Sequence, residues 1–434
     1  MINHAIIRCI RLRSFILPSQ IALGLTIHRL YGSKYLIDIL SAMGICGSYH
    51  EVSIYMTSLI NACFPKIKED AFIQHVFDNA DVNVRTLDSL GTFHAMGGIQ
   101  CVTPSESVET VTKVERISSG SFNDIVIRKY SYPNKKNRGL STIQVKDYAD
   151  LKKSMQSHEI KKIMFPLTLI WIAGIQQQPG WNGFMTFIMS SKNFETAYIL
   201  PVPFINMDPN DLSTIYTALM FAANQSKKQN QTCIVTFDQP LFLKASEIVA
   251  SSDPNNDIAK IVLRLGGFHL LMSFMGSIGK IMEGSSLENL WGTVYGQSTV
   301  HHMMNGHAYE RCVRAFTLTV LAIITILKEQ FPEIAAVISS IKAVYDELIT
   351  QKKQPEEISS DLIVEQALCT LKSILRTIES KSRTSKLWLN FIRQIDLILK
   401  FIYAERSGSW QLHVSTTLEM LPYFHAAGHL PYAK

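Results

Sequence analysis

Two aspartates occupy positions where an α/β protein can bind a metal ion. Asp238 directly follows the short apolar run 233–237 and precedes a helix-like stretch with Pro240 in its first turn. Asp78 lies in the strand-like run AFIQHVFDNADVNV, which also contains Asp81. Carboxylates at the tips of neighbouring strands can hold Mg²⁺, which prefers oxygen ligands and keeps some of its waters. We therefore predict Asp78 and Asp238 as metal ligands and catalytic acids, with Asp81 as the alternative to Asp78.

Such a pair of acids is the requirement for metal-assisted phosphodiester cleavage. Two metal ions about 4 Å apart can activate the attacking oxygen and stabilise the leaving one. Each acid also has a structural interpretation, which the sequence leaves open. Asp238 would cap the helix that follows it, and Asp78 would close an Asx-turn with Asn79.

Two histidines stand beside glycines at predicted strand–turn junctions. His94 occurs in TFHAMGG and His269 in GGFHLLM. Either could ligate a metal or orient a phosphate, or be a hydrogen-bonded core residue. The chain lacks the GxxxxGK[ST], GxGxxG, HExxH and GxSxG patterns, which argues against the commonest nucleotide-dependent and hydrolase classes.

Composition predicts a folded protein. Of 434 residues, 47% are hydrophobic and 18% charged, with a net charge of +6 that permits nucleic-acid contact without requiring it. The seven cysteines contain no CxxC pair, which favours a reducing compartment. The most lipid-like run, 315–327, is too short to span a bilayer, so no membrane association is expected. The basic, acid-free start MINHAIIRCIRLRSFILPSQ has features of a transit peptide, but an amphipathic helix pattern follows and favours a structural beginning.

Hydrophobic periodicity divides the chain into four parts. We predict an N-terminal helical segment at 1–65, followed by an α/β core at 66–285 that contains a strand and loop insertion at about 105–200. An all-helical insertion at 286–404 follows. A C-terminal helix, 405–434, would return to the core.

Several stretches resemble a poorly characterised family of mobile-element-derived animal proteins. They are VFDNADVNVRTLDSLGTFHAMGGIQCVTP, TFDQPLFLKASEIV, LRLGGFHLLMSFMGSIGKIMEGSSLENLW and AERSGSWQLHVSTTLEMLPYFHAAGHLPYAK. The chain is also distantly similar to DDE-type transposases, whose core is RNase H-like. This resemblance implies an α/β fold with an RNase H-like mixed sheet and a large all-α insertion.

The resemblance also implies roles for individual residues. Asp78 would be the first catalytic acid and Asp238 the second, and His269 would match a histidine that begins the helix after the next strand. Glu405 is the predicted third acid, with Glu283 as the alternative; Gly266 stands where such transposases often have a cysteine. Glu365, in an IVEQ sequence, lies upstream among apolar residues and is not assigned this role. If the third carboxylate belongs to a segment beyond residue 434, the chain is a truncated relative that cannot cut DNA.

The expected function is Mg²⁺-dependent DNA cleavage and strand transfer by a transposon-derived protein, located in the nucleus. The alternative is a non-catalytic, domesticated or decaying scaffold that associates with DNA, and a third hypothesis is an unrelated metabolic α/β enzyme. DNA is the expected partner, a homo-oligomer is a further expectation, and cytoplasmic location is the alternative to nuclear.

Overall fold

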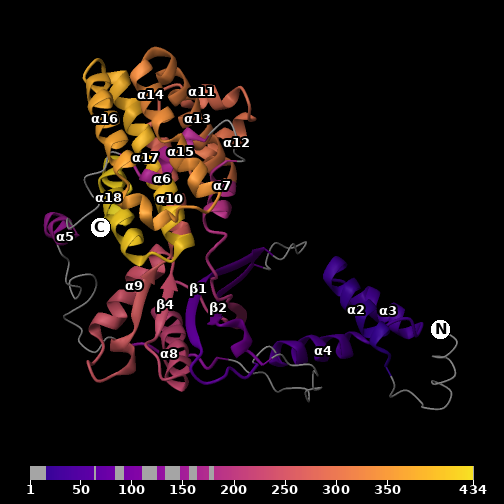
Figure 1. Cartoon of the computed structure of the whole chain (residues 1–434). Coiled ribbons are helices and arrows are strands. Elements are labelled where there is room, and N and C mark those ends of the chain that lie inside the picture. The colour runs from indigo at the N-terminus through magenta and orange to yellow at the C-terminus, as the bar shows by residue number, and fades with distance from the viewer. Residues whose placement is uncertain are drawn as a thin grey trace. The chain divides into compact units, whose positions relative to one another are not determined.

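The structure, a computed structural model, describes residues 16–62, 65–83, 92–109, 125–131, 147–155, 164–174 and 180–433. The chain divides into two compact units. The first comprises 1–142 and 195–264, and the second comprises 143–194 and 265–434. Figure 1 shows a sheet with covering helices in the first unit and a helical bundle in the second. The predicted α/β class is confirmed.

The sheet of the first unit is mixed. Its strand order is β3-β2-β1-β4-β5, in which β1 pairs antiparallel with β2, β2 antiparallel with β3, and β1 parallel with β4. The strands are β1 (Phe72–Asn83), β2 (Thr92–Thr103), β3 (Tyr198–Ile205), β4 (Ile234–Phe237) and β5 (Val262–Leu265).

One face of this sheet is covered by helices α8 (Leu212–Lys228) and α9 (Gln239–Ser251), drawn beside β4 in Figure 1. Along β1, Ile73, His75 and Phe77 are buried, whereas the alternate residues are partly or fully exposed. This period of two follows from the pleat, which sends successive side chains to opposite faces. Phe77 belongs to the same hydrophobic core as Ile215 of α8 and Leu241 of α9.

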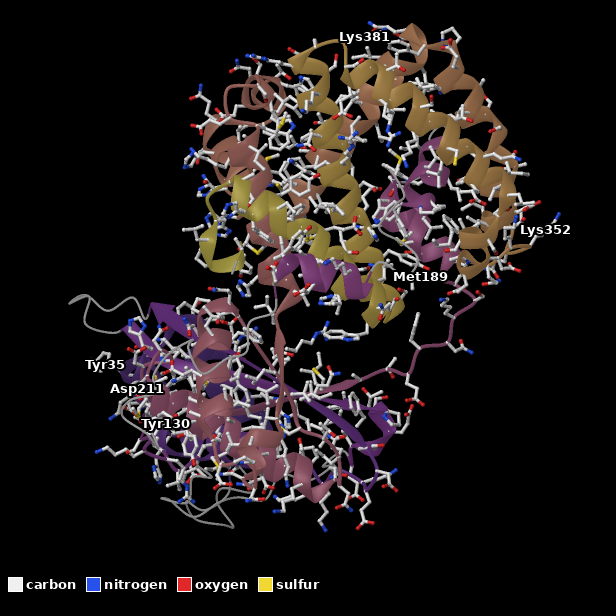
Figure 2. All side chains as sticks on the ribbon, turned by 90° about the vertical axis from the view of Figure 1, so that its left-hand side faces the viewer. Tyr35, Tyr130, Met189, Asp211, Lys352 and Lys381 are labelled. Atoms are coloured by element: carbon white, nitrogen blue, oxygen red, sulfur yellow. The ribbon has the colours of Figure 1, made fainter. Side chains whose placement is uncertain are left out.

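The start of α8 is fixed by side chains of its first turn. The carboxylate of Asp211 caps the helix and accepts a hydrogen bond from the Ser213 N–H at 2.7 Å. The Ser213 hydroxyl in turn accepts from the N–H of Tyr130, at 3.2 Å. Asp211 and Tyr130 are labelled near one another in Figure 2.

In the part of the chain described before the sheet, the helices are α2 (Pro18–Tyr31), α3 (Lys34–Ala42) and α4 (Tyr49–Ala62). They agree with the predicted N-terminal helical segment. Ile27, Ile37 and Cys46 form a small core of their own among them. The first 15 residues, on which most of the transit-peptide hypothesis rests, lie outside the described part of the chain.

The second unit is built around α17 (Arg383–Ser407), which is buried from Ile395 through Ala404. Helical structure between residues 300 and 404 is confirmed. The expectation of strands and loops at 105–200 differs from the structure. Within that range α5 (Tyr148–Met155), α6 (Pro166–Ala173) and α7 (Trp181–Ile188) are helical and belong to the second unit. The sequence PLTLIWIA of α6 is buried over nearly its whole length, so it carries no amphipathic period.

The remaining elements of the second unit are α5 (Tyr148–Met155), α6 (Pro166–Ala173), α7 (Trp181–Ile188), α10 (Gly267–Ile281), α11 (Leu287–Gly292), α12 (Gln297–Met304), α13 (Tyr309–Gln330), α14 (Pro332–Ser340), α15 (Lys342–Ile349), α16 (Leu362–Glu379), α18 (Trp410–Ala426) and α19 (Leu430–Ala433). Short 3₁₀ helices occur at Ser105–Ser107, Asp257–Lys260 and Pro355–Ser360. Among the described helices, none combines the length and the apolar character that a bilayer crossing requires.

Candidate functional site: two aspartates at the end of a parallel strand pair

The pairing of β1 with β4 brings Asp78 and Asp238 to the same level of the sheet. The recorded partners are Gln74 with Ile234, then His75 with Val235, then Val76 with Thr236. Each step advances one residue on both strands. The next step is occupied by Phe77 and Phe237, whose rings stack with centroids 5.9 Å apart. One step further, the same register sets Asp78 beside Asp238.

Asp78 lies on the sheet face opposite α8 and α9. Phe77 points into the core beneath those helices, so the next residue of β1 points to the other face. Asp238 follows the last residue of β4, and its carboxylate is directed to the first turn of α9. Both aspartates are half-buried. On the other side of Asp78 the partner on β2 is Gly97, which has no side chain to cover the acid.

The position of Asp78 within its strand differs from expectation. It was predicted to stand at a strand tip, but β1 continues to Asn83 because its last residues still pair with β2. The Asx-turn interpretation is therefore wrong, although the Asp78 Oδ1 does accept a hydrogen bond from the Asn79 N–H at 2.8 Å. Only the parallel pairing of β1 with β4 stops near Asp78, because β4 ends at Phe237.

Asp238 has the structural role that its sequence context indicated. It has extended backbone angles and caps α9, with Oδ1 accepting from the Leu241 N–H at 3.1 Å, and Pro240 lies in the first turn. The positive end of the helix dipole favours a negative charge at this position. The cap fixes the carboxylate at the end of β4, where a metal ligand was also predicted, so the two roles are compatible.

A buried histidine that the sequence analysis did not single out lies on the core side of β1. His75 is fully buried, with its ring stacked on Phe77 and edge-on to Phe221 of α8. Burial lowers the pKa of His75 to about 4, and a backbone hydrogen bond at Ile234 opposes this only in part. The ring is therefore neutral at pH 7, and its Nε2 lies 3.2 Å from the Gln100 amide nitrogen, which can donate to it. The sequence pattern that could have identified His75 is a histidine at an inward-facing position of an alternating strand. This pattern indicates a core residue.

His94 is not brought to the aspartate pair. It pairs with Asp81 across the hairpin and lies three residues along β2 from Gly97, roughly 10 Å away at the usual rise per residue. It also belongs to the opposite face by alternation. For Asp81, the structure describes only its position in β1 and its pairing with His94.

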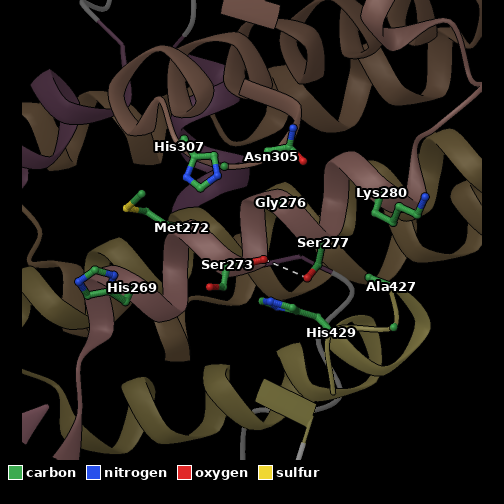
Figure 3. A pocket seen from close by; sticks show the side chains of 12 residues that line it. His269, Met272, Ser273, Gly276, Ser277, Lys280, Asn305, His307, Ala427 and His429 are labelled. Atoms are coloured by element: carbon green, nitrogen blue, oxygen red, sulfur yellow. Dashed lines mark hydrogen bonds between the residues drawn. The ribbon is translucent and has the colours of Figure 1, made fainter. Parts of the chain in front are cut away.

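The other predicted residues belong to the second unit. Glu405, near the end of α17, has Oε1 2.5 Å from the His413 Nδ1. Its other carboxylate oxygen borders Gly267, where α10 begins: a Cβ built on that glycine would lie 3.3 Å from Oε2. His269 is the third residue of α10 and lines a cavity (Figure 3). Glu405 and His269 thus both lie near the start of α10, and their grouping with the two aspartates stays a prediction.

The alternative third acids have other surroundings. Glu283 pairs with Lys280 in an exposed ion pair, and Glu365 lies in the first turn of α16. Within the described ranges, no cluster of three or more His, Cys, Asp or Glu side chains is arranged to hold a metal ion. The Asp78–Asp238 pair offers two carboxylates. This fits Mg²⁺, which proteins often hold through one or two carboxylates together with waters and substrate phosphates.

Fold and site together define a mixed α/β protein with paired aspartates at the end of a parallel strand pair and an associated helical unit. Residues 180–434, more than half of the chain, match a family described as a domain of unknown function (DUF8702), and the chain belongs to this family. Comparisons with curated proteins and with solved structures gave no match. The matched segment contains Asp238, His269 and Glu405, whereas Asp78 precedes it.

Proposed function

We propose that the protein is a transposon-derived, RNase H-like phosphodiester-cleaving and strand-transferring protein that acts on DNA with Mg²⁺ held by Asp78 and Asp238. The observation that supports this proposal is the β1–β4 register, whose last recorded pair, Val76 with Thr236, lies two residues before Asp78 and Asp238 on the two strands. The residues were selected from sequence because of their type and strand context, and they lie far apart in the chain.

The topology supports the RNase H-like part of the proposal. An antiparallel meander, β1-β2-β3, is followed by β4 and β5, and the connections between these later strands are α8 and α9. An RNase H-like core has this order, with one acid on the first strand and another where a later strand opens a helix. A doubly wound metabolic enzyme instead has a mostly parallel sheet, so this meander disfavours that hypothesis.

The chemistry follows from the donor set. A divalent cation bound by the two carboxylates supplies Lewis-acid polarisation of a phosphoryl oxygen and a more acidic water. Asp238 is oriented for this role by its bond to the Leu241 N–H, and the start of α9 favours its charged form. Asp78 has Gly97 beside it on β2, and the Phe204 ring packs over that glycine, 3.1 Å from where its Cβ would lie.

The test separates capping from metal binding. Asparagine caps a helix about as well as aspartate but brings one neutral oxygen to a cation, so Asp238→Asn keeps the cap and weakens the metal site. We expect Asp238→Asn and Asp78→Asn each to lower Mg²⁺-dependent nicking of supercoiled plasmid by at least about 100-fold. Loss of a residue that only supports a metal ligand costs up to about 100-fold, and these two residues are proposed as the ligands themselves. Asp211→Asn is the matched control, because Asp211 caps α8 in the same unit. It should leave nicking unchanged.

Two results would count against this function. Equal nicking by the wild type and Asp238→Asn would remove Asp238 from the mechanism. If the wild type shows neither nicking nor Mg²⁺ binding in a calorimetric titration, the metal proposal fails. The non-catalytic, DNA-associated alternative then becomes the better one, and the shortage of a third ligand among the described residues already favours it.

A further inference from the structure

The second unit contains a cavity of about 590 Å³ that the aspartate pair does not involve. Its walls are helix α10, the turn that follows α12, and the turn that follows α18 (Figure 3). A cavity of this size is within the range of small-molecule sites, which is about 300–1,000 Å³.

Helix α10 contributes a polar stripe to the cavity. His269, Ser273, Ser277 and Lys280 all line it. Their spacing of four, four and three residues places them on one side of the helix. Leu270, Phe274 and Ile278, on the other side, are buried in the hydrophobic core. Ser277 is itself buried, and its hydroxyl donates to the Ser273 carbonyl at 2.9 Å. The Ser277 proton is therefore used within α10, and Ser273 is the less buried hydroxyl of the stripe.

The opposite wall is held against α10 by close backbone packing. Gly306 adopts a φ of +77°, and a Cβ on it would lie 2.1 Å from the Met272 carbonyl oxygen. A Cβ on Gly279 would lie 2.0 Å from the Met304 carbonyl oxygen. These contacts require glycine, and they fix the turn that carries Asn305 and His307 into the cavity lining. The cavity is therefore a preformed feature of the fold.

The ionisable groups of the lining are one lysine and three histidines. They are Lys280, His269, His307 and His429, and no Asp or Glu is among the lining residues. Burial lowers the pKa of His429, which favours its neutral form. Lys280 does pair with Glu283, but that carboxylate lies outside the lining. The three histidines do not form a metal-binding group. The Asn305 amide nitrogen already donates to the His301 carbonyl. The lysine ammonium and the Ser273 hydroxyl, with the imidazoles beside them, are the groups that suit a phosphate group.

We propose that this cavity binds the phosphate group of a nucleotide, either as a free mononucleotide or as part of a nucleic-acid strand. The proposal goes beyond the cleavage function and does not depend on it, since no residue of the aspartate pair takes part. Lys280 contributes the fixed positive charge. His307 and Ser273 contribute hydrogen-bond donors from the two facing walls.

The experiment measures binding to the full chain by fluorescence anisotropy, with a labelled AMP and a labelled single-stranded oligonucleotide as separate probes. Lys280→Gln and His307→Gln change exposed side chains, so both variants should fold. Each should weaken binding by roughly tenfold, as expected for the loss of a charge-assisted hydrogen bond. Ser273→Leu fills the cavity without removing charge and should abolish binding. Lys342→Gln, an exposed lysine on α15, is the matched control.

These outcomes distinguish a free nucleotide from a nucleic-acid strand as the ligand, and they separate this proposal from the cleavage function. Variant-sensitive binding of AMP identifies a free nucleotide as the ligand, and variant-sensitive binding of the oligonucleotide alone identifies a strand phosphate. If neither probe binds at millimolar concentration, or if binding is the same in Ser273→Leu, the inference is overturned. Asp238→Asn should bind both probes like the wild type. The binding result can therefore be interpreted even if the proposed cleavage function fails its own test.

Discussion

The second unit contains a buried carboxyl group that should make its stability fall as pH rises. Asp396 lies on α17 and is only 7% exposed. Its Oδ2 accepts a hydrogen bond from the Phe165 N–H at 2.8 Å, so this side chain connects α17 to the residue that precedes α6. Burial raises the pKa of Asp396 from 3.8 to about 6, although hydrogen-bonding groups at Thr168 and Phe165 oppose the shift. Between these two values the folded state binds more protons than the unfolded state.

The sign and size of the effect follow from linkage. The free energy of unfolding decreases with rising pH wherever the folded state holds the extra proton. One pKa unit corresponds to 1.36 kcal/mol, so the rise from 3.8 to about 6 amounts to about 3 kcal/mol in all. About 2 kcal/mol of this is lost between pH 4.5 and pH 7.5. The contribution is fully present below the unfolded-state pKa and is lost as pH rises through the folded-state value.

Tryptophan fluorescence reads this unit selectively. All five tryptophans belong to the second unit: Trp171, Trp181, Trp291, Trp388 and Trp410. Urea unfolding of the wild type and Asp396→Asn would be followed by fluorescence at pH 4.5, 6.0 and 7.5. Asparagine can still accept from the Phe165 N–H but cannot ionise. The free-energy difference between variant and wild type should shift by about 2 kcal/mol in favour of the variant from pH 4.5 to pH 7.5.

A control of opposite sign is available in the same unit. The pKa of Asp361 is lowered, because the Lys353 ammonium and the backbone N–H groups of Ile363 and Val364 together outweigh its burial. Asp361→Asn keeps the cap of α16 but should lose stability relative to the wild type as pH rises through the carboxyl range up to the ordinary value of 3.8, and the difference should then stay nearly constant from pH 4.5 to pH 7.5. If the wild type and Asp396→Asn give parallel curves between pH 4.5 and pH 7.5, the carboxyl group at position 396 is not held protonated and the reasoning is wrong.

Two further predictions concern the core of each unit. The pKa of His75 is lowered to about 4, so the first unit should lose about 3 kcal/mol as pH falls from 6.5 to 4, because the unfolded state takes up the proton first. Histidine NMR should show one ring titrating near 4, and a titration near 6.5 would refute the burial argument. Gly279→Ala should destabilise the second unit by about 3 kcal/mol, because its Cβ would meet the Met304 carbonyl. Gly292→Ala, with open space around the Cβ, should be neutral or slightly stabilising in the same urea assay.

Local signals in the sequence predicted much of the structure. The capping role of Asp238 and the capped start of α8 follow from short-range chemistry, in which a side-chain oxygen meets an N–H two or three residues ahead. The alternating burial of β1 followed from its period of two. The helices after residue 300 were visible because their apolar faces repeat at helical spacing.

The parts that could not be predicted depend on distant pairing. The last residues of β1, DVN, resemble a turn in isolation, and they form strand only because β2 returns beside them. Helix α6 was missed because a segment buried over nearly its whole length shows no polar face. The proximity of Glu405 to the start of α10 arises from packing between helices more than 100 positions apart in the sequence, which no local pattern encodes.

The register of the aspartate pair depends on a contact that lies at the other end of the same strands. The Gln231 side chain accepts from the Ile73 N–H at 3.0 Å and donates to the Ile73 carbonyl at 2.8 Å, so it extends the β1–β4 ladder one level below its first backbone pair. A slip of one residue would turn Asp78 to the core side of the sheet, because side chains alternate. Gln231 lies in the segment that matches the family and Ile73 lies before it. The family segment therefore contains the residue that aligns β1, and through that alignment it determines where the first aspartate lies relative to the second.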